Sequence, residues 1–100
     1  MGEKLEGMAA EMRTLLQGSQ AQWVQRRLPR GLEIVLQRKG ERWRLALARP
    51  DVWPSDDEIA SCLRAFKLLD LVEEQHRLPA KGRQSYYVVE MCWREAEVVA

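Results

Sequence analysis

Arginine and lysine are concentrated in residues 26–49, which carry eight of them against only two glutamates. Guanidinium and ammonium groups bind phosphate oxygens through charge and hydrogen bonds, without reading the base sequence. The same stretch contains the clearest predicted β-hairpin of the chain, so several of its cations are expected to share one surface. The candidate nucleic-acid-binding residues lie in and around this hairpin and in a second basic loop: Arg26, Arg27, Arg30, Arg38, Lys39, Arg42, Arg44, Lys81 and Arg83.

A solvated strand face is the alternative interpretation of the same arginines, because exposed strands often alternate arginine with apolar residues. In that interpretation Arg42 pairs with Glu33 across the hairpin. The net charge is only +1, but it is segregated, with +6 over residues 26–49, −5 over 51–74 and +3 over 76–94. Segregated charge can orient a charged partner. We therefore expect the acidic stretch to lie on the side of the molecule away from any nucleic acid.

Cysteine, histidine and paired carboxylates offer little for catalysis or metal binding. A Cys–His nucleophile would need Cys62 beside His76, but Cys62 lies in the apolar stripe of a predicted helix, where a thiol is typically inert. Neighbouring carboxylates such as Asp56 and Asp57 point apart on a helix or cap it. Zinc-ligand spacing, a C-x-x-C pair and a glycine-rich phosphate loop are all absent from the sequence. We expect no enzymatic activity, no metal, no cofactor, and a free thiol at Cys92 as well.

Alternation of apolar residues predicts the hairpin over residues 31–49, with its turn around Gly40. The apolar positions on one side of its two strands are Leu32, Ile34, Leu36, Trp43, Leu45 and Leu47. A shift of register by one residue would turn all six toward solvent, so they are expected to share one buried face. The other face then carries Arg42 and Arg44.

Helical periodicity predicts an N-terminal amphipathic helix over residues 3–17 and a second helix from 55 to about 68. The second begins with a capping box, in which Ser55 and Glu58 exchange side-chain-to-backbone hydrogen bonds. The carboxylates of its first turn suit the positive end of the helix dipole and argue against its use as a DNA-recognition helix. We expect the N-terminal helix to pack on the core, with docking on a partner as the alternative.

A further strand, apolar on both faces, is predicted at residues 85–93. Residues 20–30 fit either a short edge strand or a helix capped by Ser19, and residues 71–78 fit either a strand or a loop. The expected fold is therefore one α+β domain over residues 1–100. It would have an antiparallel sheet of three to five strands with a helix packed across it.

The second functional hypothesis is a protein-interaction or homo-oligomerisation module with no role in nucleic-acid binding. Apolar residues on the sheet face opposite the main core would form a patch of the size that marks interfaces, unless the N-terminal helix covers it. Four tryptophans in 100 residues also match the composition of interface hot spots. The predicted interface residues, which favour a homodimer, are Trp23, Val35, Trp53, Tyr86 and Val88.

Targeting signals are not found in the sequence. No basic region followed by an apolar run begins the chain, and position 6 is glutamate where a myristoylation site needs serine or threonine. No apolar run approaches the ~20 residues that span a bilayer. We expect a cytoplasmic protein that contacts no membrane. Its predicted function is that of a small non-enzymatic binding module, accessory or regulatory.

Overall fold

The predicted hairpin forms strands β2 (Glu33–Lys39) and β3 (Arg42–Pro50) of a computed structural model, which describes residues 2–18, 22–78 and 86–95. The register sets Ile34 opposite Leu47 and Leu36 opposite Leu45. All six predicted apolar positions are buried, so the register inferred from alternation is confirmed. Gly40, the first of the two turn residues, has a φ of 62°, the positive value that two-residue hairpin turns require there.

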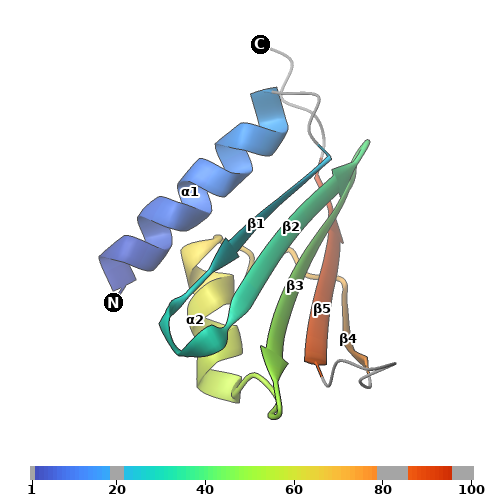
Figure 1. Cartoon of the computed structure of the whole chain (residues 1–100). Helices are drawn as coiled ribbons and strands as arrows, with labels where there is room; N and C mark the ends of the chain where they lie inside the picture. The colour runs from blue at the N-terminus through green and yellow to red at the C-terminus, as the bar shows by residue number, and fades with distance from the viewer. Residues whose placement is uncertain (1, 19–21, 79–85, 96–100) are drawn as a thin grey trace.

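The sheet has five antiparallel strands in the order β1-β2-β3-β5-β4, which confirms the α+β class (Figure 1). Its two edges are β1 (Trp23–Arg27) and β4 (Glu74–Leu78), and β5 (Tyr86–Arg94) lies between β3 and β4. Each ambiguous segment of the sequence therefore contains one of the edge strands. Each strand is five residues long, which is too short for its periodicity to separate a strand from a helix, in the first segment, or from a loop, in the second.

Helix α2 (Asp56–Ala65) starts where the sequence predicts but ends short of residue 68. Lys67 takes the left-handed conformation, with a φ of 60°. The N–H of Leu68 donates to the carbonyl oxygen of Leu63 at 2.8 Å, and the N–H of Lys67 donates to that of Arg64 at 3.1 Å. This pair of bonds is the Schellman ending of a helix. Leu68, just beyond the end of the helix, is fully buried. The buried apolar pattern therefore continues past the helix, and the sequence overestimates the length of α2.

The start of α2 is fixed by the capping box. Ser55 Oγ accepts from the N–H of Glu58 at 3.1 Å, and Glu58 Oε1 accepts from the N–H of Ser55 at 2.9 Å. Glu58 also binds Arg49 of β3, and this hydrogen bond lowers the pKa of the Glu58 carboxyl group. The carboxylate therefore joins the first turn of the helix to the sheet.

Ser55→Ala is expected to lower the free energy of unfolding by about 1 kcal/mol, because the N–H of Glu58 loses its acceptor. Urea denaturation of the two proteins measures the difference. Ser61→Ala, inside the same helix, is the matched control and should leave the urea midpoint unchanged or slightly raised. An unchanged midpoint for Ser55→Ala would show that the cap contributes nothing.

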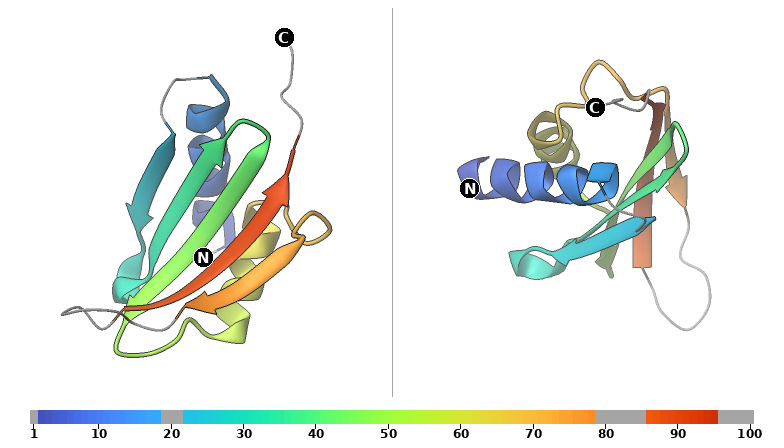
Figure 2. Two further views of the ribbon diagram at one scale, coloured as in Figure 1. Left: turned by 90° about the vertical axis from the view of Figure 1, so that its right-hand side faces the viewer. Right: turned by 90° about the horizontal axis from the view of Figure 1, so that it is seen from above.

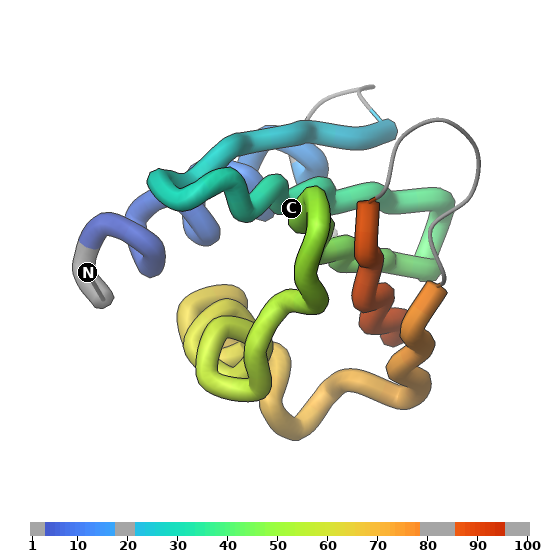
Figure 3. The backbone as a smooth tube through the Cα atoms, turned by 60° about the horizontal axis from the view of Figure 1, so that its bottom comes forward, coloured from blue at the N-terminus to red at the C-terminus, as the bar shows by residue number. Residues whose placement is uncertain are grey.

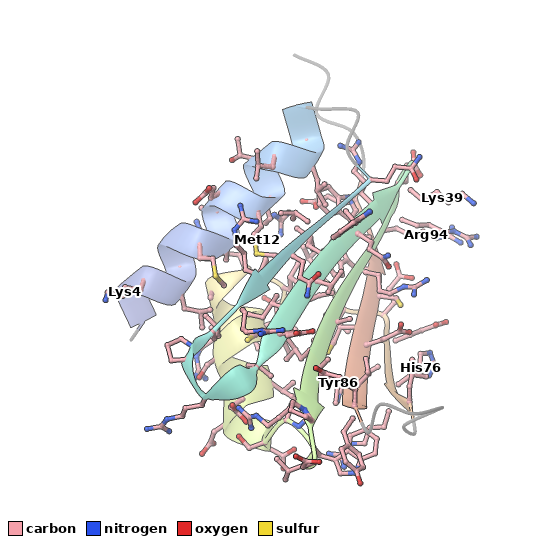
Figure 4. The ribbon with its side chains drawn as sticks, viewed as in Figure 1. Lys4, Met12, Lys39, His76, Tyr86 and Arg94 are labelled. Carbon is pink, nitrogen blue, oxygen red and sulfur yellow. The ribbon has the colours of Figure 1, made fainter. Side chains whose placement is uncertain are left out.

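Helix α1 (Gly2–Gly18) packs on the domain, as expected. Ala9, Met12 and Leu16 are 0–1 % exposed, and Figure 4 shows Met12 pointing from the helix toward the sheet. The helix contacts α2 and strands β1 and β2. Burying a methionine or leucine side chain completely contributes roughly 1.5–3 kcal/mol, so this stripe holds α1 in place.

The two helices form one layer and the sheet forms the other. Seen from above, α1 and α2 lie on the same side of the sheet (Figure 2), and the chain returns from α2 to the sheet edge at β4 (Figure 3). Between residues 2 and 95, apart from the two gaps, no helix or strand covers the opposite face. No helix in the described ranges is long and apolar enough to cross a membrane. We call the side that lacks helices the uncovered face.

Candidate nucleic-acid interface

Three cations form a row across the uncovered face at the end of the sheet that holds the β2–β3 turn. Lys39 pairs with Arg42, and Arg42 pairs with Arg94 of β5. Trp43 and Trp93, their neighbours in the chain, are buried on the helix side. Because side chains alternate along a strand, the three cations point away from the helices. Figure 4 shows Lys39 and Arg94 on the side of the sheet away from the helices. We call Lys39, Arg42 and Arg94 the basic row.

The basic row has no counter-ion within the part of the chain that the structure describes. Among residues 2–18, 22–78 and 86–95, no carboxylate forms an ion pair with any of its three members. Neighbouring strands are ~4.8 Å apart, so the backbone positions of the three charges span only ~10 Å. Like charges on directly opposite residues destabilise a sheet. A bound polyanion would remove that repulsion.

A second row of mixed chemistry lies beside the first on the same face. Its members, in register from β1 to β4, are Trp23, Gln37, Arg44, Cys92 and Glu74. Trp23 is 58 % exposed. Arg44 Nη1 donates to Glu90 at 3.0 Å, so its charge is partly engaged. Both rows line a concave region of about 550 Å³. We call these five residues the mixed row.

Arg26 and Arg27 of β1 each form an ion pair with a carboxylate of the same chain. Arg27 donates to the carboxylate of Glu33, and this hydrogen bond raises the pKa of Arg27. The expected Arg42–Glu33 pair is wrong, because the register puts these two residues at opposite ends of the hairpin. Arg26 lies on the helix side, with Nη2 3.6 Å from a carboxylate oxygen of Glu11 in α1.

Arg38 and Arg30 also lie away from the basic row. The guanidinium carbon of Arg38 is 5.1 Å from the ring centre of Trp43 on the helix side. Arg30 is in the turn after β1, with a φ of 72°, at the end of the sheet away from the β2–β3 turn (Figure 1). Lys81 and Arg83 lie outside the described residues. The structure therefore brings together Lys39, Arg42 and Arg44 from the predicted set.

Arg94 lies in the basic row but is not among the residues that the sequence predicts. It enters only because β5 pairs with β3, a contact between distant parts of the chain. One signal for it exists in the sequence. Arg42-Trp43-Arg44 and Trp93-Arg94 are the two places where a strand-forming segment puts arginine next to a tryptophan, and the two indoles stack with their centres 6.0 Å apart.

The acidic stretch is divided between the two ends of the sheet. The carboxylates in the first turn of α2 lie at the end away from the β2–β3 turn (Figure 1), as the sequence suggests. Glu73 and Glu74, however, line the concave region with the basic row. The expectation that the acidic residues all lie on the opposite side is therefore wrong for these two. They place negative charge at the β4 edge, which would direct a polyanion toward the β1–β3 side.

An apolar patch extends from the middle of the uncovered face toward the end away from the β2–β3 turn. Its residues are half-buried and come from β2, β3 and β5: Val35, Ala46, Ala48, Tyr86 and Val88. Helix α1 lies on the other side of the sheet, so it does not cover this patch.

Trp53, a predicted interface residue, is on the helix side instead. Its ring centre is 4.9 Å from that of Tyr87, and the guanidinium carbon of Arg77 lies 5.4 Å from it. Much of the indole is therefore used in contacts within the molecule. Trp23, in contrast, stays exposed at the edge of the sheet.

The two thiols are free and lie on opposite sides of the sheet, Cys62 in helix α2 and Cys92 on the uncovered face. Burial raises the pKa of Cys62 to about 11 and also raises that of Cys92, so both are protonated and weakly nucleophilic at neutral pH. His76 lies on the uncovered face, 3.2 Å from a carboxylate oxygen of Glu74. In the described ranges, no three histidine, cysteine or acidic side chains converge as metal ligands would.

The uncovered face thus combines the basic row, which forms no ion pair with a described residue, an exposed indole and the Gln37 amide in one concave region. These groups can hold an anion and stack on a flat ring, and they do not make an acid–base pair with an activated nucleophile. Comparisons of the chain with protein-family models, curated proteins and solved structures find no significant match.

Proposed function

We propose that this chain is a small non-enzymatic binding module, accessory or regulatory, that holds a nucleic-acid backbone on its uncovered face. The observation that carries the proposal is the basic row, three cations on adjacent strands with no counter-ion in the described structure. Cations in this arrangement bind phosphates without sequence specificity. The free thiols suit the reducing cytoplasm.

The unfavourable effect of the basic row on the stability of the sheet supports the same proposal. A strand face that served only to be solvated would gain from alternating signs, because opposite charges across strands stabilise a sheet. Arg27–Glu33 and Arg44–Glu90 on this face follow that rule. The basic row does not, and residues that reduce stability without a structural benefit are typical of functional sites.

Weak binding to short oligonucleotides, steeply reduced by salt, is the expected result. Three phosphate contacts on a single strand give a slope of about −2 for log K against log[salt], at about −0.7 per contact. Fluorescence anisotropy at low salt, with protein up to ~10 µM, measures the affinity, and a salt titration measures the slope. Absence of binding to both single and double strands would overturn the proposal.

A homodimerisation module is the second candidate, supported by the apolar patch and by Leu78, which is 38 % exposed beside it. Two copies meeting through their uncovered faces would bury the patch, although they would also bring the two basic rows close together. Sedimentation equilibrium at micromolar concentration separates the candidates. A dimer that binds no oligonucleotide would favour this second function over the first.

A further inference from the structure

We infer that the nucleic acid held by this face is single-stranded, with one base stacked on the indole of Trp23. This inference rests on the proposed function and specifies its ligand. Trp23 is 58 % exposed, whereas Trp43 and Trp93 are 3 % and 2 % exposed and Trp53 is half-buried against Tyr87. Of the four tryptophans, Trp23 is thus the one whose ring is largely open to a ligand.

The indole lies on the same face as the basic row. Val24, the next residue, packs against the core on the helix side, so alternation turns Trp23 to the uncovered face. Trp23 pairs with Gln37, and Lys39 is two residues further along the same neighbouring strand. Such a diagonal pair is ~7–8 Å apart. A base on the indole and a phosphate on Lys39 can therefore belong to the same short piece of strand.

A duplex fits this surface less well. Entry into a groove needs a protruding helix or hairpin, and the β2–β3 hairpin and helix α2 each present acidic groups where they would enter. The tip of the β2–β3 hairpin is Gly40-Glu41 with the Glu41 side chain exposed, and α2 begins with three carboxylates. The cations lie on the face of the sheet behind the tip. Unpaired bases can lie flat on such a face, and aromatic side chains beside cations bind single strands in this way.

Three ligands of equal length test the inference: a thymidine single strand, its abasic counterpart with the same phosphates but no bases, and a duplex. Stacking of one base on an aromatic ring makes binding ~5- to 150-fold tighter. We expect the thymidine strand to bind at least fivefold more tightly than the abasic strand, and more tightly than the duplex. Quenching of tryptophan emission should accompany binding of the thymidine strand only.

Variants at position 23 identify the ring responsible. Trp23→Ala should bind the thymidine and abasic strands equally and lose the quenching, while Trp23→Phe should keep most of the difference. Val52→Ala, which removes apolar surface at another exposed position (54 %), should behave as the wild type. Circular dichroism checks that each variant is folded.

The possible failures are distinguishable. If the wild type binds the abasic strand as tightly as the thymidine strand, or the duplex more tightly than either, the inference is wrong and the proposed function stands. If it binds none of the three ligands, both are wrong. If Trp23→Ala leaves the preference for bases unchanged, another side chain stacks the base and the assignment to Trp23 is overturned.

Discussion

Arg42→Glu is expected to weaken oligonucleotide binding at least ~10-fold and, at the same time, to make the fold slightly more stable. Arg42 is the middle member of the basic row, opposite Lys39 on one side and Arg94 on the other. A glutamate there converts two repulsive cross-strand pairs into two attractive ones. The charge of the row falls from +3 to +1, and both remaining cations gain a carboxylate that competes with phosphate.

The size of each effect follows from these charges. With one effective contact left, the salt slope should fall from about −2 to about −0.7, and affinity at low salt should fall at least ~10-fold. The urea midpoint should rise by an amount equivalent to about 0.5 kcal/mol, a small value because exposed pairs are screened by solvent. Opposite changes in binding and stability exclude unfolding as the cause of lost binding.

Lys4→Glu is the matched control, since it makes the same change in net charge on α1, in the helix layer (Figure 4). It should reduce binding only slightly. The corresponding change at Arg44 is a poorer test, because a glutamate there would lie beside Glu90, the present partner of Arg44. If Arg42→Glu and Lys4→Glu bind equally well, the basic row is not the binding site.

Local features of this fold are predictable because their causes lie within a few residues. The alternation on both sides of Gly40 determines which face of the hairpin is buried and hence its register. The start of α2 follows from the short motif at Ser55 and Glu58. The end of α2 does not follow from a local motif, because Leu68 continues the helical spacing of apolar residues but is buried by a tertiary contact beyond the end of the helix.

The site is less predictable than the fold, because it depends on strand order. Lys39 and Arg42 are joined by the hairpin turn, so their sharing of a face is a local prediction. Arg94 joins them only through the β3–β5 pairing. The pairing of Arg27 with Glu33 likewise requires β1 to lie beside β2, which the ambiguous pattern of residues 20–30 does not show. Counting cations along the chain therefore overestimates the site, and only the register shows which charges remain unpaired.

The anchoring of α1 by Arg13 is the clearest feature that no local pattern predicts. Its Nη2 donates to both carboxylate oxygens of Glu95, at 2.5 and 2.6 Å, across 82 residues of sequence. Its Nη1 donates to the carbonyl oxygen of Phe66 at 2.8 Å, and its guanidinium carbon lies 5.6 Å from the ring centre of Trp43. On the helix pattern alone, Arg13 belongs to the polar side. In the fold it connects α1 to the ends of α2 and β5.

Arg13→Met is therefore expected to lower the free energy of unfolding by about 3 kcal/mol. Methionine keeps the apolar part of the side chain but removes the charge-assisted hydrogen bonds, which contribute ~1.5–3 kcal/mol, and the contact with the Trp43 ring, which adds ~0.5–1 kcal/mol. The side chains of Arg13 and Glu95 are only 17 % and 29 % exposed, so solvent screens the pair incompletely. The loss is a large share of the ~5–15 kcal/mol that stabilises a domain.

Urea denaturation of Arg13→Met, Glu95→Gln and the double variant measures how much of the effect is the pair itself. We expect the sum of the two single losses of unfolding free energy to exceed the loss in the double variant by at least ~1 kcal/mol, because the contributions of residues in one hydrogen-bonded network are not additive. Arg26→Met is the control: its contact with Glu11 also joins α1 to the sheet, but at 3.6 Å and with the Glu11 side chain 64 % exposed, so its loss should be within ~0.5 kcal/mol. Equal effects at Arg13 and Arg26 would contradict an anchoring role, and α1 would then be held by its apolar stripe alone.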